Sequence, residues 1–133
     1  ASDMIVVDAS VLVDLLLQVE DAPALTARLL DPELALNAPH LVDIEVAQAL
    51  RRYVRSGELS PARGRAALDD LADPPLERYP HSLLLPRIWS YRDNLTAYDA
   101  TYLALADALD CLVWTRDARF AKAPPAIDRV RLI

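Results

Sequence analysis

The chain has 133 residues, of which 53% are apolar and 26% charged, and its formal net charge is −6. This length suits a single domain spanning residues 1–133, and the apolar fraction excludes an intrinsically disordered chain, which needs low hydrophobicity and high net charge. The acidic balance argues against broad binding of nucleic acid, because such binding depends on neutralising phosphates. The single cysteine, Cys111, excludes an intrachain disulfide and any zinc site built on paired cysteines.

The N-terminal region carries no basic segment followed by an apolar one, and no apolar stretch approaches the length of a membrane span. We therefore expect neither a secretion signal nor a membrane anchor, and a reduced cytoplasmic setting fits the cysteine count. Met4 is a candidate for the natural first residue, with residues 1–3 a remnant of processing or cloning.

Short apolar runs alternate with helical patterns along the chain. The first run, Met4 to Val7, ends at the carboxylate of Asp8 and is typical of a strand buried on both faces. The predicted strands are 4–7, 34–37, 76–79, 111–115 and 130–133. The predicted helices are 10–18 with Ser10 as N-cap, 23–30, 41–56, 61–72, 81–94 and 96–109. This alternation predicts an α/β fold of three layers, with a central, mostly parallel sheet and helices on both faces.

Two prolines limit the predicted strand 76–79 and the predicted helix 81–94. Pro80 confines the 76–79 strand to an edge of the sheet, because proline cannot donate a hydrogen bond to a neighbouring strand. Pro86 either is tolerated near the start of the 81–94 helix or divides that helix.

Four carboxylates stand where predicted strands end or predicted helices begin: Asp8, Glu45, Asp99 and Asp117. Each also has a purely structural interpretation, as a helix N-cap, as part of a capping box with Thr96, or as a favourable charge at a helix N-terminus. Glu45 and Asp99, however, border apolar stripes on their helices. An acid that points along an apolar stripe must be paired, protonated or bound to a metal.

If the four carboxylates converge, they require a cation. Two carboxylates about 4 Å apart repel by roughly 4 kcal/mol at an effective dielectric constant near 20. Oxygen ligands without histidine or cysteine suit Mg²⁺ or Mn²⁺. Such an ion can bind a phosphodiester oxygen, lower the pKa of a bound water and stabilise the leaving oxygen. The pattern therefore favours metal-dependent cleavage of phosphodiesters, in which the cation offsets the negative charge locally.

Four segments carry a family resemblance: residues 5–10, the Glu45 helix with its sequence Ala49-Leu50-Arg51-Arg52, residues 95–106, and residues 115–120. In this order and spacing they resemble the PIN-domain family, and more narrowly its VapC-type toxins of type II toxin–antitoxin pairs. The resemblance spans essentially the whole chain and implies a three-layer PIN-like fold. It also implies a cytoplasmic Mg²⁺- or Mn²⁺-dependent endoribonuclease that is a homodimer and is neutralised by a cognate antitoxin.

Carried over residue by residue, the resemblance implies that Asp8, Glu45, Asp99 and Asp117 are the catalytic, metal-binding acids. Ser10 and Thr115 match the small hydroxyl residues beside the first and last acids. The substrate implied is RNA, either tRNA or another structured or single-stranded RNA.

Three arginines are candidates for contacts with RNA phosphates: Arg116, next to Asp117, and then Arg92 and Arg52. For each of them an ordinary surface position is the alternative interpretation. Asp14 and Asp43 are predicted to lie on solvent-facing sides of their helices.

Two other functions are weighed against the nuclease. A catalytically silent PIN-fold module that binds RNA or protein would share the fold, but the intact set of acids argues against it. A response-regulator receiver would need adjacent acids after the first strand and a late lysine after another strand. Asp8 has no acidic neighbour and Lys122 follows no predicted strand, so the receiver is disfavoured.

Overall fold

The computed structural model describes residues 3–19 and 22–133. Five strands form one sheet in the order β3-β2-β1-β4-β5, and every neighbouring pair is parallel. The strands are β1 (Asp3–Val7), β2 (Leu34–Pro39), β3 (Leu76–Tyr79), β4 (Leu112–Thr115) and β5 (Val130–Leu132). The predicted α/β class is therefore confirmed, with a sheet that is parallel throughout.

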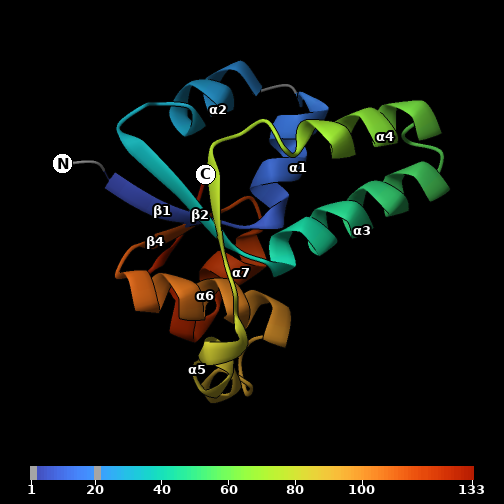
Figure 1. The fold of residues 1–133 in the computed structure, drawn as a ribbon. Helices are drawn as coiled ribbons and strands as arrows, with labels where there is room; N and C mark the ends of the chain where they lie inside the picture. Colours follow the sequence, from blue (N-terminus) through green and yellow to red (C-terminus); the bar gives the residue numbers. More distant parts are fainter. Residues whose placement is uncertain (1–2, 20–21) are drawn as a thin grey trace.

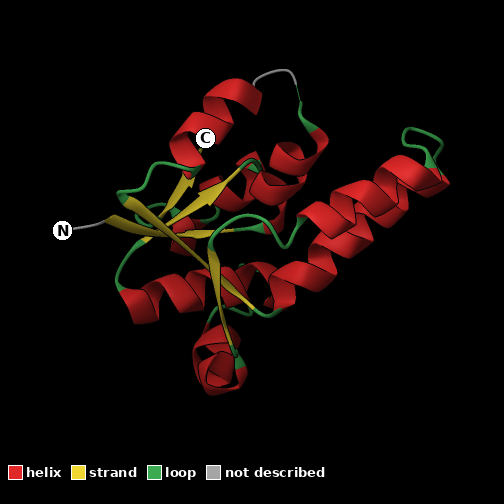
Figure 2. Ribbon diagram, turned by 45° about the horizontal axis from the view of Figure 1, so that its top comes forward, coloured by secondary structure: helices red, strands yellow, loops and turns green. Residues whose placement is uncertain are grey.

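The α-helices are α1 (Ala9–Leu17), α2 (Ala22–Leu29), α3 (Leu41–Arg55), α4 (Pro61–Asp70), α5 (Leu85–Ser90), α6 (Ala97–Leu109) and α7 (Ala118–Lys122). Two short 3₁₀ helices are η1 (Ser82–Leu84) and η2 (Pro124–Ala126). Helices α1 and α2 lie on one side of the sheet and α6 lies on the other, which gives the expected three layers (Figures 1 and 2). Within residues 3–19 and 22–133, no helix is both long and apolar enough to cross a membrane.

The core lies where the central strands meet the helices on both faces. Val6 and Val7 of β1 and Val113 of β4 have no exposed surface, as expected for strands covered on two sides. Leu12 of α1 and Tyr102 of α6 pack against them in the same apolar cluster. The packing of helices against both faces of the sheet thus holds the carboxyl ends of β1, β2 and β4 in fixed positions.

The order of the strands places a crevice beside β1. From β1 the chain proceeds through β2 to β3 in one direction, and β4 and β5 are added on the other side of β1. Ligands of open parallel sheets bind outside the carboxyl ends of the strands at such a reversal. Asp8 directly follows β1, and Asp117 lies just after β4.

Some predicted elements differ from the observed ones. The 81–94 segment is not one helix: η1 is followed by the short helix α5, with Pro86 in its first turn. Proline suits a first turn and cannot continue the preceding helical hydrogen bonds, so it divides the segment. The prediction of Ser10 as N-cap is also wrong, because α1 begins at Ala9 and Asp8 caps it.

Candidate active site

Asp8 is held in one orientation at the junction of β1 and α1. Its Oδ1 accepts hydrogen bonds from the Ser10 hydroxyl at 2.5 Å and from the Val11 backbone N–H at 3.4 Å. Its Oδ2 accepts a hydrogen bond from the Thr115 hydroxyl at 2.5 Å. The carboxylate is thus both a helix cap and a fixed, inward-facing acid, which shows that the two interpretations of this residue are compatible.

Burial destabilises the ionised form of the Asp8 carboxyl group relative to the neutral form. Asp8 is only 6% exposed. Its pKa rises from 3.8 to about 6 in total, because loss of hydration and, to a smaller extent, the nearby Glu45 outweigh the lowering effect of the hydrogen bonds from Ser10, Thr115 and Val11. A cation beside Asp8 would favour the carboxylate over the acid.

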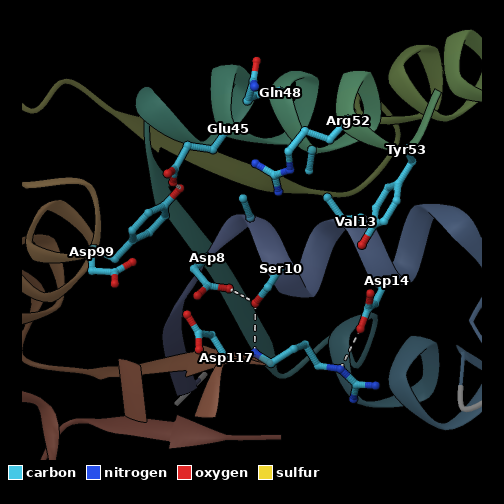
Figure 3. A pocket seen from close by; sticks show the side chains of 14 residues that line it. Asp8, Ser10, Val13, Asp14, Glu45, Gln48, Arg52, Tyr53, Asp99 and Asp117 are labelled. Carbon is cyan, nitrogen blue, oxygen red and sulfur yellow. Dashed lines mark hydrogen bonds and ion pairs between the residues drawn. The ribbon is translucent and has the colours of Figure 1, made fainter. Parts of the chain in front are cut away.

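The other three acids belong to segments distant in sequence, and their side chains line the same pocket as Asp8. Asp8, Glu45 of α3, Asp99 of α6 and Asp117 line one pocket of about 430 Å³ (Figure 3). Burial raises the pKa of Asp99 to about 6, with repulsion from Asp117, Asp8 and Glu45 adding to the shift. The structure therefore brings together all four acids singled out from the sequence.

Tyr102 is a site residue that the sequence analysis did not single out. Its hydroxyl donates a hydrogen bond of 2.5 Å to Oε1 of Glu45. The Tyr102 side chain is 1% exposed, and burial together with the charge of Glu45 raises its pKa, so the phenol stays protonated as a donor. Its position three residues after Asp99, on the same side of α6, is the signal that could have indicated it.

Thr115 and Asp117 connect the end of β4 to Asp8. The Thr115 hydroxyl accepts a hydrogen bond from the Asp117 backbone N–H at 3.0 Å while donating to Asp8. Asp117 caps α7, accepting a hydrogen bond of 2.9 Å from the Arg119 backbone N–H. Ser10 accepts a hydrogen bond of 2.9 Å from the Arg116 backbone N–H. Ser10 and Thr115 therefore join the first and last acids into one hydrogen-bonded unit.

Comparison with known proteins agrees with this architecture. A model of the PIN-domain family matches residues 5–124, which is most of the chain. The chain belongs to the PIN-domain family. It is 47% identical over 132 residues to Ribonuclease VapC1 of Mycobacterium tuberculosis, covering 98% of each chain. It is 45% identical over 118 residues to Ribonuclease VapC9 of the same organism, covering 89% of each chain.

Solved structures share the fold of this PIN domain at low sequence identity. VapBC2 from Rickettsia felis, bound to a DNA fragment from its promoter, gives a TM-score of 0.69 at 13% identity and covers 97% of this chain and 98% of that one. Mycobacterium tuberculosis VapC20, a sarcin-ricin loop cleaving toxin, gives 0.66 at 17% identity, with 88% and 92% covered. The family resemblance expected from the sequence is confirmed.

The four carboxylates in the pocket of this PIN domain suit a hard divalent cation that keeps much of its hydration shell. In the described part of the chain, no three histidine, cysteine or acidic side chains are gathered closely enough to enclose an ion by themselves. Mg²⁺ nevertheless binds proteins through one or two carboxylates and keeps several waters. A pocket bordered by four carboxylates, two of which have raised pKa values, meets that requirement without a closed cage.

The three candidate arginines occupy different surroundings. Arg116 lines the pocket, but its Nε lies 2.9 Å from Oδ2 of Asp14, and its Nη1 donates to the Ile133 carbonyl at 3.2 Å. The prediction of a solvent-facing Asp14 is therefore wrong, because Asp14 lines the pocket and its side chain is only 27% exposed. Asp43 pairs with Arg78 at 2.9 Å but remains 40% exposed, as predicted. Arg92 packs over the Trp89 ring at 5.1 Å, and Arg52 borders the pocket.

We expect Thr115→Val to reduce the free energy of unfolding by about 1–3 kcal/mol. The substitution removes a buried donor to Asp8 and leaves the Asp117 N–H without its acceptor. Urea denaturation measures the loss. Thr101→Val is the matched control, because within the described part of the chain the buried Thr101 hydroxyl bonds only to the Ala97 carbonyl of its own helix. Its loss should cost less than about 1 kcal/mol. Equal losses in the two variants would contradict the role of Thr115 as a connector.

Proposed function

We infer that this PIN domain is a metal-dependent endoribonuclease of the VapC type, the toxin of a toxin–antitoxin pair. The observation that carries the proposal is the meeting of four carboxylates from β1, α3, α6 and the end of β4 in one pocket. The 47% identity to Ribonuclease VapC1 over nearly the whole chain supports RNA as the substrate.

Asp8 and Asp99 are the first residues we expect to hold Mg²⁺ or Mn²⁺, with Glu45 and Asp117 completing the set directly or through water. When bound, the cation would supply Lewis-acid polarisation of a phosphodiester oxygen and activation of water. Ser10 and Thr115 fix the Asp8 carboxylate by hydrogen bonds, and Tyr102 fixes Glu45. These residues maintain the spacing of the acids before RNA arrives, so little reorganisation is needed during the reaction.

The same proposal includes protein partners. We expect a cognate antitoxin, by analogy with the solved complex of VapBC2 and with a toxin–antitoxin complex from Klebsiella pneumoniae. We also propose that the protein is a homodimer and that it acts in the cytoplasm. Large apolar side chains at the surface support partners of this kind. Leu83 of η1 is 90% exposed, Trp89 of α5 is 67% exposed, and Ile44 of α3 is 69% exposed.

The test is cleavage of a mixed pool of small RNAs by antitoxin-free protein with Mg²⁺, with Mn²⁺ or with EDTA. We expect discrete cuts with a divalent cation and none with EDTA, because the acids alone repel the phosphodiester. Asp99→Asn protein prepared in parallel identifies a contaminating nuclease. Cleavage that persists in EDTA, or that is equal in the variant, would contradict the proposal. Binding of Mg²⁺ without any cleavage would indicate a silent module instead.

A further inference from the structure

Helix α3 lines the acidic pocket along its length. Glu45, Arg52 and Tyr53 all border the pocket. Residues seven and eight positions apart share one face of an α-helix, so these side chains form a single stripe of α3 turned towards the pocket (Figure 3). The backbone positions of Glu45 and Arg52 are about 10 Å apart along the helix axis, at 1.5 Å per residue. The pocket thus has an acidic end at Glu45 and a second end at Arg52 and Tyr53.

The two ends differ in how their side chains are held. At the acidic end, Asp8 and Glu45 accept short hydrogen bonds from neighbouring hydroxyls. Among residues 3–19 and 22–133, no hydrogen bond or ion pair involves the side chains of Arg52 or Tyr53. Figure 3 shows the Arg52 side chain directed from α3 into the pocket, with its guanidinium turned towards the Glu45 side and the Tyr53 ring on the other side, near Asp14. The second end therefore offers a cation and an aromatic ring that no other described side chain uses.

The electrostatics of the second end favour an anion at Arg52. Asp14 also borders the pocket, but its carboxylate is paired with Arg116 at 2.9 Å. Among the residues that the structure describes, the charge of Arg52 is consequently the one left for a ligand at this end. A guanidinium presents several N–H donors in a fork that matches a phosphate, and a phenol ring provides a face on which a base can stack.

We propose that Arg52 and Tyr53 form a nucleotide-binding subsite for single-stranded RNA next to the acidic cluster. Arg52 holds a phosphate, and Tyr53 stacks on an unpaired base of the same stretch. Because Arg52, Tyr53 and the four acids line one pocket, this contact lies within a few nucleotides of the scissile phosphate. The subsite requires unpaired RNA, because a base must leave its own stack to lie on Tyr53. The inference rests on the proposed ribonuclease function.

The test measures RNA binding separately from cleavage, in a background of Asp99→Asn. The probe is a fluorescently labelled single-stranded RNA of about 12 nucleotides, followed by anisotropy in Mg²⁺ and in EDTA over a range of salt. We expect Arg52→Ala to weaken binding about tenfold and to reduce the slope of log affinity against log salt by about 1. Tyr53→Leu should weaken binding about tenfold with the salt slope unchanged, and Tyr53→Phe should bind as the parent does.

Arg51→Ala is the matched control. It removes the same charge from the adjacent residue, which faces a different groove between α3 and α4. We expect its affinity to stay within about twofold of the parent, since only distant, screened electrostatics change. Equal effects of Arg52→Ala and Arg51→Ala, with RNA cleaved normally by the wild type, would overturn the subsite and leave the ribonuclease standing. If none of these proteins bound RNA or cleaved it, both the subsite and the proposed ribonuclease function would be overturned.

Discussion

Asp99→Asn is expected to lower metal-dependent RNA cleavage by at least about 100-fold and yet to stabilise the metal-free protein at neutral pH. Activity falls because a ligand of the proposed cation is lost, and such an ion stabilises the transition state by several kcal/mol. Stability rises because asparagine removes a partly buried charge that Asp117, Asp8 and Glu45 repel. Because solvent screens this partly buried charge, a gain of about 1–2 kcal/mol in the free energy of unfolding is expected. Cleavage rates and urea denaturation in EDTA measure the two effects.

Asp69→Asn is the matched control for this variant. Asp69 lies on the surface of α4, where its carboxylate is 61% exposed and pairs with Arg65 at 3.0 Å. Such a pair contributes at most about 1 kcal/mol, so cleavage and stability should both remain close to the wild type. Full cleavage by Asp99→Asn would refute the assignment of the acids. A loss of stability in that variant would instead show that Asp99 is a structural residue.

Acidification is expected to stabilise the metal-free protein between about pH 7.5 and pH 5. The pKa values of Asp8 and Asp99 rise from 3.8 to about 6 on folding, so the folded chain binds protons more tightly than the unfolded one. The resulting stabilisation is fully present below the unfolded pKa and is lost as the pH rises through about 6. From about pH 7.5 to pH 5 each group should contribute about 1 kcal/mol, which thermal unfolding in EDTA measures as a higher Tm.

At neutral pH, Mg²⁺ should stabilise the folded chain as protonation of Asp8 and Asp99 does at lower pH. At about pH 7.5 a saturating divalent cation is expected to raise Tm, because it binds the folded chain and relieves the same repulsion. At about pH 5 the added ion should have little effect, since Asp8 and Asp99 are then largely protonated. The pH-dependent gain should shrink in Asp99→Asn by roughly half, as one of two groups is absent. A Tm in EDTA that falls steadily from neutral pH to about pH 5 would contradict the predicted pKa values.

Sequence alone predicted the elements whose causes are local. The apolar run ending at Asp8 became β1, the Thr96 hydroxyl caps α6 by accepting a hydrogen bond from the Asp99 N–H, and Pro80 limits β3 to the edge of the sheet. Each depends on neighbouring residues or on the rule that proline cannot continue a ladder. The proximity of Asp8 and Asp117 also followed from sequence, because the carboxyl ends of parallel strands meet at one edge of a sheet. The convergence of Glu45 and Asp99, which lie on α3 and α6, was implied only by the family resemblance.

Tertiary structure decided how the side chains at that edge are held. Tyr102 donates to Glu45 across 57 positions of sequence, and Arg116 pairs with Asp14 across 102 positions. Hydrophobic periodicity assigns a residue to a face of its helix but carries no information about which distant side chain meets it. Whether an arginine at the site is engaged, as Arg116 is, or directed into the pocket, as Arg52 is, therefore depends on how the helices and strands pack.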